Sequence, residues 1–140
     1  MPDLEVERWY RPCRSARTRT ARRTRNAVLR LRDALHTCDV GALRRLLHPR
    51  VSLVIDGGGI LPAPAHAVTG GVAVTRALVQ AIAGVPRASI EEAHVNGQSG
   101  LTLRVAGRVI AVMGIGVRGQ RIHQIWLIAN PVKLTDWNRP

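Results

Sequence analysis

Aromatic residues are scarce in this 140-residue chain: they make up 3% of it, and Phe is absent. A core must therefore be built from Val, Leu, Ile and Ala, and the apolar content of 46% is enough to supply one. Lys133 is the only lysine among 21 basic residues. Two cysteines, Cys13 and Cys38, are too few for a disulfide framework or a four-cysteine zinc site, so we expect free thiols.

Long apolar runs are also missing. The longest, residues 109–117, covers nine positions, whereas a membrane-spanning helix needs about 20. No apolar stretch follows the charged N-terminus as it would in a secretory signal. We therefore expect a single cytoplasmic domain that makes no contact with a membrane.

Positive charge is concentrated near the N-terminus of a chain whose net charge is +12. A segment with this much like charge and few apolar residues repels itself and cannot form a core. Residues 1–25 are thus predicted to be a disordered or extended arm, or a solvated helical extension. The arm is either a solvated tail or a weak contact for nucleic acid through residues 11–25. The arginines of the segment are Arg8, Arg11, Arg14, Arg17, Arg19, Arg22, Arg23 and Arg25.

Three stretches repeat apolar residues every three or four positions and predict helices. The first begins with Asn26 as its cap, the second is capped by Asp39 and ends at Pro49, and the third stops before Gly84. The apolar positions are Val28, Leu31, Leu35 and Cys38 in the first, Val40, Leu43 and Leu47 in the second, and Val74, Ala77, Leu78, Ala81 and Ile82 in the third.

The rest of the chain is typical of strands. An apolar run covers residues 51–55, and four further strands are expected near 88–96, 100–105, 108–117 and 120–129. Asn96-Gly97, Ala106-Gly107 and Arg118-Gly119 mark the turns between them. Helices followed by an antiparallel sheet predict the α+β class.

Turn positions also predict the register. Turns at 97–98, 106–107 and 118–119 place His94 and His123 on an otherwise apolar face, although a slip of one residue would exchange the two faces. The apolar members are Leu101, Leu103, Ile110, Val112, Ile125 and Leu127. The opposite face is mixed, and we expect either a half-exposed sheet or a homodimer contact there. It carries Thr102, Arg104, Val109, Met113, Gln124, Trp126 and Ile128.

A few polar residues could carry chemistry. A histidine in an apolar pocket can act as a general base, and Asp56 at a strand end could orient it. The structural alternatives are a hydrogen-bonded core histidine and a tight glycine turn after Asp56. The string Gly114-x-Gly116-x-x-Gly119 lies in a hairpin, where a dinucleotide motif does not work, and we expect neither metal nor cofactor. The candidates are Asp56, His66, Glu92, His94, Asn96 and His123.

Several short motifs, taken in their order along the chain, resemble those of one family. They are Leu46-Leu47-His48-Pro49-Arg50-Val51, Asp56-Gly57-Gly58-Gly59, Gly70-Gly71, Val95-Asn96-Gly97-Gln98-Ser99-Gly100-Leu101 and Asn130-Pro131-Val132-Lys133-Leu134. Over residues 26–137 the chain resembles the SnoaL-like, nuclear-transport-factor-2-like domain at the C-terminus of extracytoplasmic-function sigma factors.

The resemblance implies a cone-shaped α+β fold, with three helices packed on a curved antiparallel sheet that encloses a pocket. It also implies that the DGGG and NPxKL motifs belong to the region that contacts the sigma core. Two departures concern charge: Ile60 stands where the family usually has Lys, and Val132 where it usually has Asp.

Two functions are consistent with these observations. The first is a stand-alone module in transcription regulation that binds a small apolar ligand or a sigma-factor-like protein. Its expected contact residues are Gly57, Gly58, Gly59, Asn96, Asn130 and Lys133. The second is a cofactor-independent enzyme (an isomerase, polyketide cyclase or epoxide hydrolase) with His94 or His123 as base and Asp56 as its partner.

Overall fold

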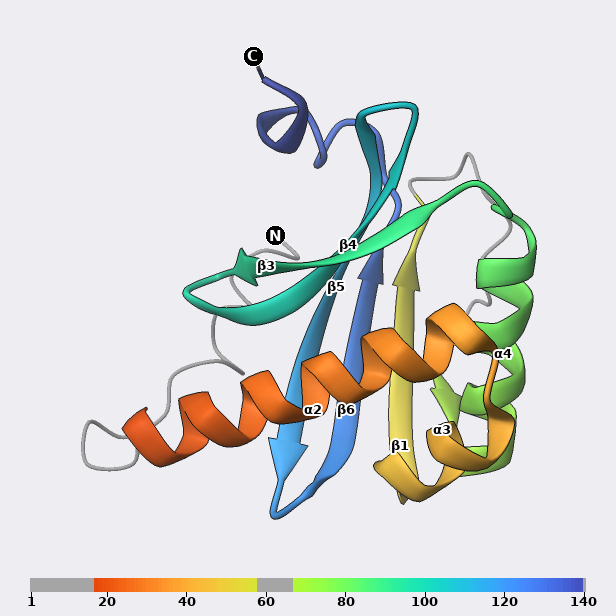
Figure 1. The fold of residues 1–140 in the computed structure, drawn as a ribbon, viewed down its shortest axis with the longest axis vertical. Helices are drawn as coiled ribbons and strands as arrows, with labels where there is room; N and C mark the ends of the chain where they lie inside the picture. Colours follow the sequence, from red (N-terminus) through yellow and green to blue (C-terminus); the bar gives the residue numbers. More distant parts are fainter. Residues whose placement is uncertain (1–16, 58–66, 140) are drawn as a thin grey trace.

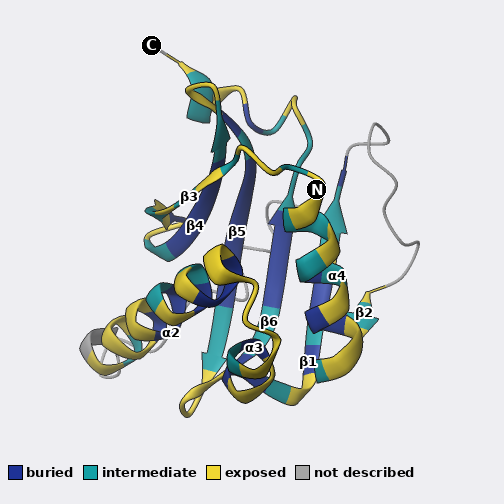
Figure 2. Ribbon diagram, turned by 45° about the vertical axis from the view of Figure 1, so that its right-hand side comes forward, coloured by how far each residue is buried: buried dark blue, intermediate teal, exposed yellow. Residues whose placement is uncertain are grey.

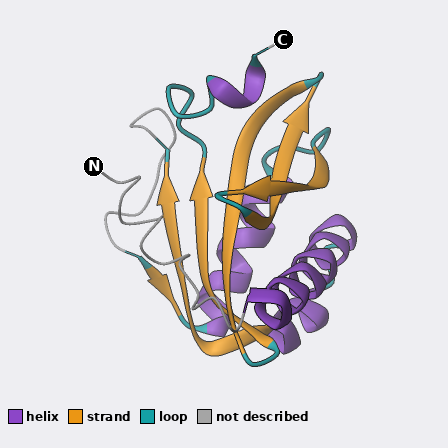
Figure 3. Ribbon diagram, turned by 90° about the vertical axis from the view of Figure 1, so that its left-hand side faces the viewer, coloured by secondary structure: helices purple, strands orange, loops and turns teal. Residues whose placement is uncertain are grey.

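The computed structural model describes residues 17–57 and 67–139, and it places the three α-helices on one side of a curved sheet (Figures 1 and 3). The helices are α2 (Arg17–Thr37), α3 (Val40–Leu46) and α4 (Gly71–Ala83), and a short 3-10 helix, η2, spans Asp136–Asn138. The strands are β1 (Leu47–Asp56), β2 (Val68–Thr69), β3 (Ser89–Val95), β4 (Gln98–Val105), β5 (Arg108–Arg118) and β6 (Arg121–Ile128).

The six strands form one sheet in the order β2-β1-β6-β5-β4-β3. Neighbouring strands run antiparallel except β1 and β6, which are parallel. The first long strand therefore lies beside the last one, and β1 and β6 finish at the same end of the sheet. These layers confirm the predicted α+β class.

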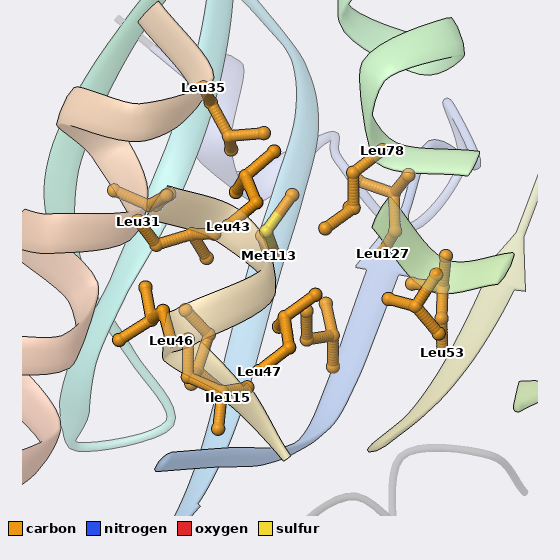
Figure 4. Close-up of a cluster of buried hydrophobic side chains, with 14 of the residues drawn as sticks. Leu31, Leu35, Leu43, Leu46, Leu47, Leu53, Leu78, Met113, Ile115 and Leu127 are labelled. Carbon is orange, nitrogen blue, oxygen red and sulfur yellow. The ribbon is translucent and has the colours of Figure 1, made fainter. Parts of the chain in front are cut away.

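The core lies between the helices and the sheet and consists mostly of aliphatic side chains (Figure 4). Each fully buried Leu, Ile or Met side chain stabilises the fold by roughly 1.5–3 kcal/mol, which is how a chain without Phe can hold three helices on the sheet. The largest fully buried side chains are Leu31, Leu35, Leu43, Leu47, Leu53, Leu78, Leu101, Met113, Ile115, Ile122, Ile125 and Val28.

Helix α2 begins at Arg17, nine residues before the cap predicted at Asn26. Asn26 is an exposed residue inside the helix. The turn directly before Asn26 packs on the rest of the molecule: Thr24 is buried, and Arg25 is paired with Glu92 of β3. At the other end, Cys38 lies beyond the helix with a positive φ of 52° and is an exposed free thiol rather than a core residue.

The other two helices follow the sequence pattern. Asp39 caps α3, and its Oδ1 accepts a hydrogen bond from the backbone N–H of Ala42 at 3.0 Å. Leu47 is buried as expected but already belongs to β1. Helix α4 buries Val74 and Leu78 and ends at Gly84.

The register of the sheet differs from the predicted one at each hairpin. The first turn is Asn96-Gly97, so His94 lies opposite Ser99 and not Leu101. Ala106-Gly107 forms the second turn as predicted, but the third lies at 119–120, one residue later than expected.

Two bulges shift the pairing further. One leaves Ile110 as an extra residue opposite β4, and the other leaves His123 as an extra residue opposite β5. Each bulge moves the following residues by one position, which exchanges the faces.

The corrected faces separate two apolar clusters. Met113, predicted on the mixed face, is buried in the core, whereas Val112, predicted in the core, lies on the opposite face. There Val112 packs with Val95, Val109 and Leu134. Leu134 belongs to the segment after β6 (Figure 1). The chain itself therefore covers part of the face for which we expected either a half-exposed sheet or a homodimer contact.

Asn138 fixes this segment to the sheet. Its side-chain Nδ2 donates to the carbonyl oxygen of Val109 at 3.0 Å, and its Oδ1 accepts from the N–H of Val109 at 2.8 Å. Among residues 17–57 and 67–139, no helix is long and apolar enough to cross a membrane.

Candidate functional site

Asp56 and Lys133 connect the ends of two neighbouring strands. Asp56 is the last residue of β1 and lies level with Ile128 of β6. The Nζ atom of Lys133 donates to Oδ2 of Asp56 at 2.5 Å, and the N–H of Ala129 donates to the carbonyl oxygen of Asp56 at 2.7 Å. The Asp56 and Lys133 side chains are 32% and 24% exposed. We call residues 56–57 and 129–133 the clasp.

The segment after β6 is shaped by its own hydrogen bonds. Oδ1 of Asn130 accepts from the N–H of Val132 at 3.1 Å, and the backbone oxygen of Asn130 accepts from the N–H of Leu134 at 3.1 Å. Val132 is consequently turned outward and is 80% exposed. Gly57 is buried at the end of β1, whereas Gly58 and Gly59 lie outside the described residues.

The candidate histidines lie elsewhere. His94 is exposed on β3, at the far edge of the sheet from β1. His123 is half-buried, and its ring lies 4.6 Å from the ring of His48, centroid to centroid. Burial lowers the pKa of His123 below the ordinary histidine value, and the positive charge of Arg118 lowers this pKa further.

The expected pairing of Asp56 with a histidine is not formed in the structure. Asp56 is level with Ile128, five residues from His123, which corresponds to roughly 16 Å along a strand. His94 is separated from β1 by three intervening strands. His123 also does not lie on the apolar, core-facing side of the sheet, because the core positions beside it belong to Ile122 and Ile125.

Two other sequence candidates have structural roles. Glu92 accepts a hydrogen bond from Ser99 Oγ at 2.8 Å and from Arg25 Nε at 3.1 Å, and so joins β3 to α2. The Ser99 hydrogen bond is the main reason that the pKa of Glu92 is lowered. Asn96 is an exposed turn residue with a positive φ of 52°. His66 lies outside the described residues.

The helical side has a groove that sequence reasoning missed. It lies between α2, α3 and the β5–β6 turn, has a volume of about 620 Å³, and is lined among others by Arg30, Asp33, Arg45 and Arg121. Hydrophobic periodicity reports which side of a helix faces the core and gives no signal for a groove made by the outer sides. In the described part of the chain, no three His, Cys, Asp or Glu side chains are grouped to hold a metal ion.

Comparison with known proteins rests on structure alone, because no family model and no curated protein matches the chain. A crystal structure of the extracytoplasmic function sigma factor SigJ from Mycobacterium tuberculosis matches 81% of this chain with a TM-score of 0.63 and 28% identity. The NTF2-like protein mll8193 from Mesorhizobium loti matches 79% of this chain and 93% of its own, with 18% identity and a TM-score of 0.56. This chain has the SnoaL-like, nuclear-transport-factor-2-like fold.

Enzyme-like proteins share this SnoaL-like fold. IdmH, a putative polyketide cyclase from Streptomyces antibioticus, covers 79% of this chain and 94% of its own length, with 15% identity and a TM-score of 0.57. This chain corresponds to 44% of the SigJ chain, less than half of that protein.

Proposed function

We propose that this SnoaL-like chain is a binding module of transcription regulation and that it contacts a sigma-factor-like protein through the clasp. The observation that carries the proposal is the Lys133–Asp56 ion pair. It joins two residues that are 77 positions apart in the sequence. Each residue belongs to a motif that resembles a motif in the contact region of sigma-factor appendages. The 28% identity with SigJ supports the same assignment.

The clasp has properties that favour protein binding. The ion pair and the Ala129–Asp56 hydrogen bond hold residues 129–133 against β1 before any partner arrives, and a preorganised segment loses less conformational entropy on binding. Val132 offers an exposed apolar side chain beside these paired charges. We therefore expect the partner to present an apolar site to Val132. Where the family has its usual Asp at this position, the partner would present a cation instead.

Binding also fits the described residues better than acid–base catalysis does. A general base and its orienting carboxylate must lie within hydrogen-bond reach, whereas Asp56 is bonded to Lys133 and is remote from both His94 and His123. The enzyme alternative would require another acid–base pair.

The test is an affinity measurement between the full chain and the part of SigJ outside the matched segment, by isothermal titration calorimetry. Asp56→Asn and Lys133→Gln each break the ion pair of the clasp and should weaken binding about tenfold, the equivalent of one ion-paired hydrogen bond. The double variant D56K/K133D restores an ion pair with reversed charges and should recover most of the affinity.

A control comes from the same segment. Asp136 and Arg139 form an exposed ion pair at 3.1 Å, and Asp136→Asn should leave the affinity unchanged because surface pairs contribute little. Absence of binding by the unaltered chain, or equal affinity for Asp56→Asn and the unaltered chain, would refute the proposal.

A further inference from the structure

A second groove lies between α3 and α4, which are side by side on the helical layer (Figure 2). Its volume is about 320 Å³, within the general range of small-ligand sites. It lies on the helical side of the sheet, and Figure 1 shows α3 at the end of the molecule opposite the segment that follows β6. The lining residues are Val40, Arg44, Val72, Thr75, Arg76, Val79 and Gln80.

Thr75 is a buried lining residue whose hydroxyl group is unsatisfied. The residue is 3% exposed, and its Oγ1 has no hydrogen-bond partner among the residues that the structure describes. A buried hydroxyl without a partner is costly, and most such groups in native proteins are paired with protein, water or ligand. The Thr75 Oγ1 is itself inaccessible to solvent, so Thr75 is part of the groove wall and does not present a hydrogen-bond donor to a ligand in the groove.

The walls of the groove are apolar and exposed. Val40 is 48% exposed and Val72 is 54% exposed, and both are among the few large apolar side chains that the described part of the chain leaves open to water. Val79 is a further apolar member of the lining. Covering these side chains would remove apolar surface from water, which favours a ligand with a hydrocarbon portion.

The charge of the groove is positive. Arg44 and Arg76 are both exposed, neither is in an ion pair with another described residue, and no acidic residue is in the lining. Guanidinium groups bind carboxylates and phosphates through paired hydrogen bonds. The polar end of the ligand should accordingly be an anion.

We propose that the α3–α4 groove binds a small amphiphile whose anionic head contacts Arg44 and Arg76. Its tail packs on the three valines. At roughly 30 Å³ per water-sized group, a groove of about 320 Å³ holds about ten non-hydrogen atoms. An eight-carbon carboxylate has this size. The site is independent of the clasp, so either proposal can fail while the other stands.

The experiment titrates sodium octanoate into the full chain and follows backbone and methyl NMR shifts. Saturable shifts should appear at Val40, Val72 and Val79, and octan-1-ol, which lacks the charge, should bind at least tenfold more weakly. Equal binding of octanol and octanoate, or shifts that do not saturate, would overturn the proposal.

Two variants distinguish a specific site from non-specific adsorption. Arg44→Gln should weaken octanoate binding about tenfold, whereas Arg45→Gln, its neighbour on α3 that lines the other groove, should not. Equal effects of R44Q and R45Q would contradict the assignment.

Discussion

Leu134 is the anchor that should hold the segment after β6 on the outer face of the sheet. It is 3% exposed and packs in a small cluster with Val95, Val109 and Val112. Leu134→Ala deletes three carbons at about 0.8 kcal/mol each, and the residual cavity adds to that loss. Because a small peripheral cluster can partly collapse, we expect a loss of about 2.5 kcal/mol, near the lower end of measured Leu→Ala costs.

The assay is urea unfolding at pH 7, with Val132→Ala as the matched control. Val132 lies two residues away and is 80% exposed, so its truncation should change the free energy of unfolding by less than about 0.5 kcal/mol. For Leu134→Ala we expect a melting temperature lower by roughly 5–10 °C. We also expect faster hydrogen exchange at the Val109 amide, which Asn138 holds. Equal stabilities of the two variants would refute the reasoning.

Three further outcomes are expected. Gly100→Ala should cost more than about 2 kcal/mol in urea unfolding, because a Cβ there would lie 2.6 Å from the backbone oxygen of Met113 and 2.6 Å from Val95 Cγ2. At Gly116 the nearest atom to an added Cβ is the Gln124 Cβ at 3.3 Å, and two Trp126 ring atoms follow at 3.8 Å, so Gly116→Ala should cost less; equal losses would mean that the close approach at Gly100 is absent. Because burial lowers the pKa of His123, the folded chain binds fewer protons than the unfolded chain below about pH 6.5. Stability should therefore fall as the pH drops from about 6.5 toward the lowered pKa, and His123→Gln should make the dependence shallower; an unchanged pH profile would contradict this reasoning. Any binding of α2 to duplex DNA should weaken steeply as salt is added. A variant that carries Gln at three exposed arginines should have a shallower slope of log affinity against log salt concentration, by about 0.9 for each phosphate that is no longer neutralised. An unchanged slope would show that these three residues do not contact DNA; they are Arg19, Arg22 and Arg23.

Local signals predicted much of the fold. Asn96-Gly97 gives a two-residue turn in which both residues have positive φ, the conformation that this dipeptide favours. Asp39 caps α3, and the stripe of α4 faces the core. These features depend on residues that are close together in the sequence, so a single sequence was enough to predict them.

The bulges could not be predicted in the same way. Residues 109–117 are apolar at nearly every position, so alternation does not distinguish a regular strand from one with an extra residue. Ile110 therefore went unrecognised as the bulged position, and Met113 was assigned to the wrong face. The sequence did not decide between a disordered arm and a solvated helical extension before Asn26, because the contact of Arg25 with Glu92 joins residues 67 positions apart.

The candidate site shows the same limit. The resemblance placed Asp56 and Lys133 in one region, but their ion pair depends on β1 lying parallel to β6, which neither strand shows in its own sequence. The α3–α4 groove gave no signal at all, because it is formed by the outer sides of two helices whose periodicity describes only their core-facing sides.

Hydrogen–deuterium exchange with and without the part of SigJ outside the matched segment tests the proposed partner contact most directly. We predict slower exchange at residues 129–134 and at Gly57 in the complex, with α3 and α4 unchanged. Protection confined to the helices, or no protection anywhere in the chain, would contradict the assignment of the clasp as the binding surface.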